Sequence, residues 1–247
     1  MKDKSKYKKR IVLLDSHAIL HRAFHAIPDF ATSSGKPTGA LYGLASMILS
    51  IAKDLQPDHI IACYDLPGGT FRSVLSETYK AHRKKTDDGL AAQIEESREI
   101  MDAFSIPRYE KKGYEADDLL GTIAELLKKD KDNEIIIASG DMDTLQLVDK
   151  TQVKVFTLKR GLTDTIIYDE KGVLERFGFG PKLLPDYKGL RGDPSDNIIG
   201  IPGIGEKTAT TLITKFGTIE SIYKKLNKSD APFREAGITP RIIELLR

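Results

Sequence analysis

The stretch at residues 11–15, Ile-Val-Leu-Leu-Asp, decides the fold expected for this chain. A short apolar run that stops at a carboxylate is typical of a strand buried on both faces of a parallel sheet. Residues 60–64 and 134–138 have the same character. Apolar residues at helical spacing fill the segments that separate these runs, at 39–55, 91–104 and 116–127. The alternation predicts an α/β fold, with a mostly parallel central sheet flanked by helices.

Acidic residues follow each of the three runs. Asp15 ends the first, Asp65 follows the second, and Asp141 with Asp143 follows the third. Ligands of open parallel sheets bind beyond the carboxyl ends of the strands, so these side chains are expected at one edge. Two more acidic clusters lie near residues 117 and 195. The full set of candidate metal ligands is Asp15, Asp65, Glu115, Asp117, Asp118, Asp141, Asp143, Asp193 and Asp196.

Crowded carboxylates repel one another unless a divalent cation neutralises them, and their oxygens are the ligands that Mg²⁺ and Mn²⁺ prefer. Glu115 and Asp118 share one face of the predicted helix and Asp117 projects to the next, which suits two nearby ions. Taken singly, each acid could instead cap a helix or shape a turn. The recurrence of acids beside successive strands favours a metal site.

A glycine-rich run at residues 200–209, Gly-Ile-Pro-Gly-Ile-Gly-Glu-Lys-Thr-Ala, begins a predicted helix. It is not a nucleotide-binding P-loop, because Glu206 separates Gly205 from Lys207 and no strand precedes it. Gly203 and Gly205 instead suit a tight hairpin whose N–H groups hold a phosphodiester, with Lys207 adding charge. A plain turn between helices is the alternative. Together with the acids, the hairpin predicts a nuclease.

The composition is that of a globular enzyme. The 247 residues are 40% hydrophobic and 30% charged, which excludes a disordered or collagen-like chain. The net charge of +2 averages the acidic clusters with two basic stretches. One is formed by Lys80, Arg83, Lys84 and Lys85. The other is expected to be a solvated, frayed terminus and contains Lys2, Lys4, Lys6, Lys8, Lys9 and Arg10.

Cysteine and histidine provide neither a disulfide nor a zinc framework. Cys63 is the single cysteine, which indicates a reducing compartment. His17, His21 and His25 share a helical face but spread over two turns, too far to converge on one zinc ion. No apolar stretch approaches the length of a membrane span or a signal-peptide core, so a cytoplasmic protein without membrane contact is expected.

Two unequal domains are expected. Residues 66–89 are polar, basic and long for a connection, which is typical of a functional lid or a disordered segment. After about residue 168 the chain has helical patterns alone. We therefore expect an α/β catalytic domain at 1–168 and a helical DNA-binding subdomain at 169–247. The last residues begin a helix without a stop signal, as in a fragment of a longer chain.

Seven short motifs occur in a fixed order between about residues 10 and 225. They are Leu14-Asp15, Arg22-Ala-Phe-His-Ala26, Tyr79-Lys-Ala-His-Arg83, Gly113-Tyr-Glu-Ala-Asp-Asp118, Gly140-Asp-Met-Asp143, Gly192-Asp-Pro-Ser-Asp-Asn197 and Gly203-Ile-Gly-Glu-Lys-Thr-Ala209. Jointly they resemble the 5′ nuclease, or flap endonuclease, family. The resemblance is strongest to the 5′–3′ exonuclease domain at the N-terminus of bacterial DNA polymerase I and its free-standing relatives.

This resemblance implies a PIN-like 5′ nuclease fold with a helical arch at about 66–89 and a helix-hairpin-helix at about 196–216. All nine acids match the family's metal site, which implies an active enzyme that uses two or more Mg²⁺ ions, with Mn²⁺ as a substitute. A free 5′ strand would pass through the arch. The helix-hairpin-helix would hold the duplex, with a K⁺ ion between backbone carbonyls and a phosphate.

The resemblance also implies roles for single side chains. Asp15, Asp65, Glu115 and Asp117 are expected at the inner metal site, and the other five acids around a second ion. Arg22, Lys80 and Arg83 would neutralise phosphates and complete the catalytic set. The residues expected to contact DNA are His21, Arg22, Tyr79, Lys80, Arg83, Gly203, Gly205, Lys207 and Thr208.

Three positions depart from the family pattern. His21 stands where Tyr or Phe is usual, and we expect it to stack more weakly on a base. Ser16 replaces a frequent glycine, and Ile199 replaces a usual proline. These departures concern details of the site and leave the predicted class unchanged.

The expected function is a structure-specific 5′–3′ exonuclease and 5′-flap endonuclease that hydrolyses DNA in replication and repair. Its expected partners are DNA with a 5′ flap or a 5′ end at a duplex junction, and a covalently following polymerase; a monomer is expected. Two alternatives stay open. One is a PIN-like metal-dependent ribonuclease, and the other is a non-catalytic, structure-selective DNA-binding module whose acids hold a structural ion.

Overall fold

The structure, a computed structural model, describes residues 7–27, 30–83, 85–160 and 164–247. Lys2, Lys4, Lys6 and Lys84 of the predicted basic stretches lie outside these ranges. The chain divides into two compact units. The α/β unit contains Met1–Phe71 and Lys84–Asp169, and the helical unit contains Arg72–Arg83 and Glu170–Arg247. Part of the predicted arch is thus grouped with the helical unit.

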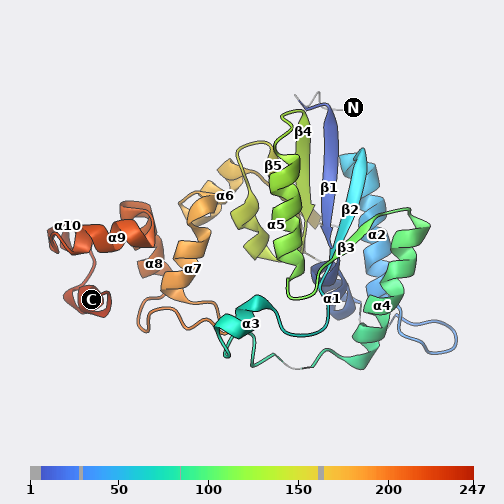
Figure 1. The fold of residues 1–247 in the computed structure, drawn as a ribbon, viewed down its shortest axis with the longest axis horizontal. Coiled ribbons are helices and arrows are strands. Elements are labelled where there is room, and N and C mark those ends of the chain that lie inside the picture. The colour runs from blue at the N-terminus through green and yellow to red at the C-terminus, as the bar shows by residue number, and fades with distance from the viewer. Residues whose placement is uncertain (1–6, 28–29, 84, 161–163) are drawn as a thin grey trace. The chain divides into compact units, whose positions relative to one another are not determined.

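A six-stranded sheet forms the centre of the α/β unit (Figure 1). Its strands, in spatial order, are β3 (Arg108–Glu110), β2 (His59–Tyr64), β1 (Lys9–Asp15), β4 (Asn133–Ala138), β5 (Val153–Arg160) and β6 (Asp164–Tyr168). All neighbours are parallel except β5 and β6. The mostly parallel sheet is therefore confirmed, and the three apolar runs form its adjacent strands β2, β1 and β4.

Helices cover both faces of the sheet (Figure 1). On one face, α1 (Ser16–Ala26), α2 (Gly39–Leu55) and α4 (Asp88–Ala103) pack on Val12 and Leu14 of β1. The other face meets α5 (Ala116–Leu127), and Leu13 there is also fully buried. Burial on both faces explains why the strands are continuously apolar.

The prediction of a frayed N-terminus is wrong for its last residues. Lys9 and Arg10 begin β1. The Nε–H of Arg10 donates to Glu134 on β4 at 2.7 Å, and its backbone N–H donates to Asp58 at 2.7 Å. Lys8 donates to Asp132 at 2.6 Å. Partners more than forty residues away along the chain hold this segment, and the local sequence does not show them.

The helical unit contains α6 (Glu170–Phe177), η2 (Pro181–Leu183), α7 (Leu184–Arg191), α8 (Glu206–Phe216), α9 (Ile219–Leu226), α10 (Ala231–Glu235) and α11 (Pro240–Leu245). Its core includes Tyr187, Leu212 and Phe233, and Phe233 stacks on Phe216 with ring centroids 4.2 Å apart. The preceding helix α3 (Phe71–Leu75) lies in the predicted arch. The prediction of helices after residue 168 is confirmed.

The connection between α7 and α8 differs from the predicted helix-hairpin-helix at 196–216. The first helix is α7, which ends at Arg191, and residues 192–205 contain no helix. Gly192 and Gly200 adopt positive φ angles of 82° and 67°. A Cβ on either would collide with the backbone of the opposite segment, so only glycine permits this close approach. Gly192 is the C-cap of α7, and the glycine pair lets the two backbone segments of the connection lie in contact.

Among the described residues, no helix is both long and apolar enough to cross a membrane.

Candidate functional site

Seven predicted metal ligands belong to the α/β unit. Asp15 is the last residue of β1, and Asp65 follows β2, whose residues run parallel and level with those of β1. The start of α5 reaches the same edge, since the Ala116 N–H donates to Asp65 Oδ1 at 2.7 Å. We call this group the acidic edge, and it consists of Asp15, Asp65, Glu115, Asp117, Asp118, Asp141 and Asp143.

Asp15 is nearly inaccessible, with 4% of its surface exposed. Burial raises its pKa to about 6, and the negative charges of Asp65 and Asp141 add to the effect. Two hydrogen bonds oppose the rise: Ser139 Oγ–H donates to Oδ2 at 2.6 Å, and the Ala18 N–H donates to Oδ1 at 3.0 Å. A buried carboxylate near other acids is a group whose charge a cation would stabilise.

The thiol of Cys63 lies close enough to several of the acids for their charges to affect it. Burial raises its pKa to about 12, and the charges of Asp15, Asp117 and Asp65 contribute. Cys63 lies on β2 and is fully buried, so it is inert as a nucleophile. The acids that affect Cys63 come from the end of β1, the residue after β2 and the start of α5, so these three places lie close together.

Asp65 is held by His17 as well as by α5. The Asp65 N–H donates to His17 Nδ1 at 3.1 Å, so that nitrogen has no proton. Burial lowers the pKa of His17, which keeps the ring neutral. The ring lies edge-on to Tyr64, with centroids 5.6 Å apart. Sequence reasoning considered His17 solely as a zinc ligand and missed this support.

Several acids of the acidic edge also cap helices. The Asp118 side chain accepts the Glu115 N–H at 2.9 Å at the start of α5. Asp141 Oδ1 accepts the Asp143 N–H at 2.8 Å at the start of the short helix η1 (Met142–Leu147). The capping alternative is thus real for these residues. It does not exclude cation binding, because a carboxylate has two oxygens with several lone pairs.

Arg22 lies beside the loop that follows β4. A Cβ placed on Gly140 would stand 3.6 Å from Arg22 Cδ and 3.2 Å from the Ala18 carbonyl oxygen. Arg22 is half-buried on α1, and His21 before it is exposed. The Arg22 side chain therefore lies beside Gly140, the residue before Asp141.

Asp193 and Asp196 lie in a tight turn of the helical unit. The Asp193 N–H donates to the Ile198 carbonyl at 2.7 Å, and the Ile198 N–H donates back at 2.9 Å. Burial opposes ionisation of Asp193, but hydrogen bonds from Lys188 (2.6 Å) and Ser195 (2.6 Å from Oγ) outweigh it and lower its pKa to about 2. A carboxylate oxygen of Asp193 and one of Asp196 lie within 4.8 Å.

The basic segment at 78–83 packs on this turn within the helical unit. Arg83 donates to Asp196 Oδ1 at 2.7 Å, Tyr79 Oη–H donates to Oδ2 at 3.2 Å, and Lys80 Nζ lies 3.9 Å from Oδ1. Asn197 Nδ2–H donates to the Thr78 carbonyl at 2.7 Å. The predicted phosphate-binding cations are thus paired with a predicted metal ligand, which the sequence does not indicate.

The predicted hairpin residues lie at the start of α8. Gly203 has a φ of 95°, which favours glycine, and Gly205 is the N-cap of the helix. Gly203, Gly205 and Lys207 are exposed, and Thr208 is half-buried. Backbone N–H groups at this helix start and the Lys207 ammonium suit an anion.

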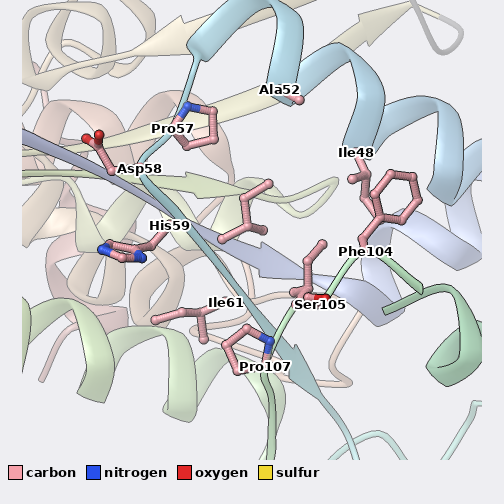
Figure 2. A pocket seen from close by; sticks show the side chains of 11 residues that line it. Ile48, Ala52, Pro57, Asp58, His59, Ile61, Phe104, Ser105 and Pro107 are labelled. Atoms are coloured by element: carbon pink, nitrogen blue, oxygen red, sulfur yellow. The ribbon is translucent and has the colours of Figure 1, made fainter. Parts of the chain in front are cut away.

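A pocket of about 480 Å³ lies elsewhere on the α/β unit, where α2 ends and β2 begins (Figure 2). Its lining is mainly apolar and includes Ile48, Phe104 and Pro107. The one carboxylate among the described residues that line this pocket, Asp58, accepts a hydrogen bond from the Arg10 N–H. The pocket begins at the opposite end of β2 from Asp65 and has no set of convergent polar groups, so it does not suit phosphate chemistry.

Comparisons with known proteins cover nearly the whole chain. Residues 10–178 match the family described as 5′-3′ exonuclease, N-terminal resolvase-like domain, and residues 179–240 match 5′-3′ exonuclease, C-terminal SAM fold. DNA polymerase I of Caldicellulosiruptor bescii is 41% identical over 227 residues, which are 92% of this chain and 27% of that protein. DNA polymerase I of Bacillus subtilis is 39% identical over 222 residues, which are 90% of this chain and 25% of that protein. The chain spans about a quarter of the length of these relatives.

Solved structures share the fold. The T5 5′-exonuclease with bound zinc ions has a TM-score of 0.71 and 23% identity, covering 96% of this chain and 86% of the other. The catalytic core of Rad2 in complex with a DNA substrate has a TM-score of 0.54 and 18% identity, covering 96% and 71%. At these identities the likeness concerns the fold alone. Since both halves of the family match in order along residues 10–240, the chain belongs to the 5′–3′ exonuclease family.

Proposed function

We propose that this protein is a Mg²⁺-dependent 5′ nuclease that hydrolyses phosphodiesters of DNA at 5′ flaps and 5′ ends. The observation that supports this most is Asp15, a buried carboxylate whose pKa is raised to about 6 at an edge with six further acids. Such a site favours a cation that offsets the cost of ionisation. The donors are all oxygen, which suits hard ions such as Mg²⁺ or Mn²⁺.

The oxygen ligands of the predicted set suit divalent cations, and we propose that two ions bind. Asp15, Asp65, Glu115 and Asp117 would hold the first, and Asp118, Asp141, Asp143, Asp193 and Asp196 would serve the second directly or through water. Bound Mg²⁺ would supply an ionised water and stabilise charge on the attacking and leaving oxygens. The carboxylates would hold the ions in place. The attacking group would be water, so no protein side chain is required as a nucleophile.

Cationic and backbone groups would position the DNA. Arg22, Lys80 and Arg83 would bind the scissile or flanking phosphates, because guanidinium groups form paired hydrogen bonds with them. His21 would stack on a base, and Tyr79 would contact the strand. Gly203, Gly205, Lys207 and Thr208 would hold the duplex backbone, with a K⁺ ion as the proposed additional ligand of the hairpin.

The two parts of the chain would have different tasks. We assign catalysis to residues 1–168, with the arch at 66–89, and duplex binding to 169–247, although residues 72–83 of the arch are grouped with the helical unit. The matched residues make up 27% and 25% of the relatives named DNA polymerase I, so we infer that a polymerase follows this nuclease covalently and that the two act in replication and repair. We also propose that the protein is a monomer. The proposed substrates are 5′ flaps and 5′ ends at duplex junctions.

A cleavage assay with three substrates separates the candidate functions. A 5′-flap duplex, a blunt duplex and a single RNA strand are incubated with Mg²⁺ or EDTA. We expect Mg²⁺-dependent cleavage of the flap; cleavage of RNA alone would favour the ribonuclease, and binding without cleavage would favour the DNA-binding module.

Asp117→Asn should abolish flap cleavage with DNA affinity retained, since it removes a cation ligand and adds no bulk. Glu99→Gln is the matched control, an exposed carboxylate on α4 outside the acidic edge. Near-normal cleavage by Asp117→Asn would contradict the assignment.

A further inference from the structure

We propose that Ser139 is a positioning residue that fixes Asp15 relative to Asp141 for cation binding, an inference that rests on the proposed nuclease function. Ser139 directly follows β4 and is 3% exposed. It contributes no carboxylate and is not among the nine predicted ligands. Its hydroxyl connects two of them.

The hydroxyl has a defined direction. Ser139 Oγ accepts the Asp141 N–H at 2.9 Å, and its proton is donated to Asp15 Oδ2 at 2.6 Å. The Asp141 N–H can serve only as a donor, so the hydroxyl proton is available for Asp15. Asp15 ends β1 and Asp141 follows β4, and one oxygen atom therefore joins the ends of two strands.

The backbone around Ser139 is held as firmly as its side chain. The Ser139 N–H donates to the Phe156 carbonyl of β5 at 3.1 Å. The next residue, Gly140, lies so close to α1 that a Cβ would approach the Ala18 carbonyl to 3.2 Å. The Ala18 N–H in turn donates to Asp15 Oδ1 at 3.0 Å. The Asp15 carboxylate thus accepts one hydrogen bond from the first turn of α1 and another from the loop after β4.

This arrangement predicts an effect on cation affinity. Groups that hold metal ligands in place typically change affinity by about 10–100-fold when removed. Without the Ser139 hydroxyl, Asp15 keeps one of its two donors and can rotate, and Asp141 loses the acceptor of its N–H. A hydroxyl that served folding alone would change the melting temperature and leave cation affinity unchanged.

The test uses the DNA-free protein and Mn²⁺ as the probe, with affinity measured by titration calorimetry. Ser139→Thr retains the hydroxyl, and Ser139→Val has nearly the same shape without it. We expect Ser139→Val to bind Mn²⁺ about 10–100-fold more weakly and Ser139→Thr to stay within a few-fold of the wild type. Ser139→Ala should behave like Ser139→Val, which provides a smaller variant should valine fail to fold.

Ser97→Ala is the matched control, because Ser97 is also a fully buried serine with two hydrogen-bond partners, Ile94 and Tyr64. It should lower stability and leave Mn²⁺ affinity unchanged. Equal affinities of Ser139→Val and Ser139→Thr, or an equal loss in Ser97→Ala, would overturn the proposal. Failure of the Ser139 proposal leaves the proposed nuclease function intact as long as the wild type cleaves flaps with Mg²⁺. If the wild type neither cleaves flaps nor binds Mn²⁺, the proposed nuclease function is itself refuted.

Discussion

Asp15→Asn should make the metal-free protein more stable at neutral pH, although it removes a proposed catalytic ligand. The wild-type carboxylate must ionise in a site that disfavours charge, and the amide is neutral at every pH. Asparagine has nearly the same shape, and its carbonyl oxygen can still accept the Ala18 N–H. The substitution therefore removes the electrostatic cost of keeping Asp15 charged, together with the carboxylate oxygen that accepts from Ser139.

The magnitude follows from the pKa of Asp15. Its ordinary value of 3.8 is raised to about 6 in the folded protein. A difference of roughly two pKa units corresponds to about 3 kcal/mol of unfolding free energy above pH 6. The Ser139 hydroxyl loses its carboxylate acceptor, which costs about 1 kcal/mol. The net gain is about 2 kcal/mol, or roughly 4–8 °C for a chain of this size.

The pH dependence has a definite sign. Between pH 4 and 6 the folded wild type binds more protons than the unfolded chain, so its stability falls as pH rises through this window. The advantage of Asp15→Asn should thus be absent near pH 4, grow to pH 6 and then stay constant. Mg²⁺ should reverse the order, because it stabilises the wild type more than the variant.

The assay is thermal unfolding followed by circular dichroism in EDTA at pH 5, 6 and 7.5, then with Mg²⁺ at pH 7.5. Glu99→Gln, an exposed carboxylate, should melt with the wild type throughout. If Asp15→Asn melts below the wild type at pH 7.5 in EDTA, the hydrogen bonds of Asp15 outweigh its desolvation, and the electrostatic reasoning is refuted.

Three further outcomes are expected. Arg83→Gln should lower turnover on flapped DNA and reduce the salt slope of binding by about one, since one phosphate contact is removed; an unchanged slope would count against it. Asp196→Asn should loosen the 78–83 segment, because it removes the ion pair with Arg83, and should raise the rate of tryptic cleavage there. The increase should be at most about fivefold, since the pair is part-exposed and therefore weak; equal digestion rates would contradict the pairing. Gly200→Ala should destabilise the protein by more than about 2 kcal/mol in denaturant unfolding, given its positive φ and the close Gly192 backbone, and a neutral result would refute the packing argument.

Much of the α/β unit follows from hydrophobic periodicity. Helices α2 and α5 begin and end at the predicted residues, and β1, β2 and β4 contain the three apolar runs. Helix α4 begins at Asp88, three residues before the predicted start, because the Asp87 side chain caps it. Strands β3, β5 and β6 were missed. Strand β3 is three exposed residues. Charged and polar residues interrupt β5, and β6 begins with two polar residues, so neither strand has the continuous apolar run expected of a buried strand.

The positions of Asp15, Asp65 and Asp141 could be predicted because each of them ends or closely follows a parallel strand. An acid after a buried parallel strand lies at the ligand-binding edge whatever its tertiary neighbours are. Their supporting groups could not. Ser139 meets Asp15 across 124 residues, and His17 meets Asp65 across 48. A serine before a glycine and a histidine on a helix have many ordinary explanations, and their positions in the sequence do not identify these contacts.

The ion pair between Arg83 and Asp196 shows a different kind of limit. The family resemblance predicts a phosphate as the ligand of Arg83 and a cation as the ligand of Asp196, whereas in the structure Arg83 donates to Asp196 Oδ1 at 2.7 Å. Any ligand that takes one of them must break this pair. Arg83 is half exposed, so the pair contributes about 0.2–1 kcal/mol and yields readily to a phosphate or a divalent ion. Arg83 and Asp196 can therefore neutralise one another in the DNA-free protein. The free energy needed to separate them is small compared with that of binding a phosphate or a divalent ion.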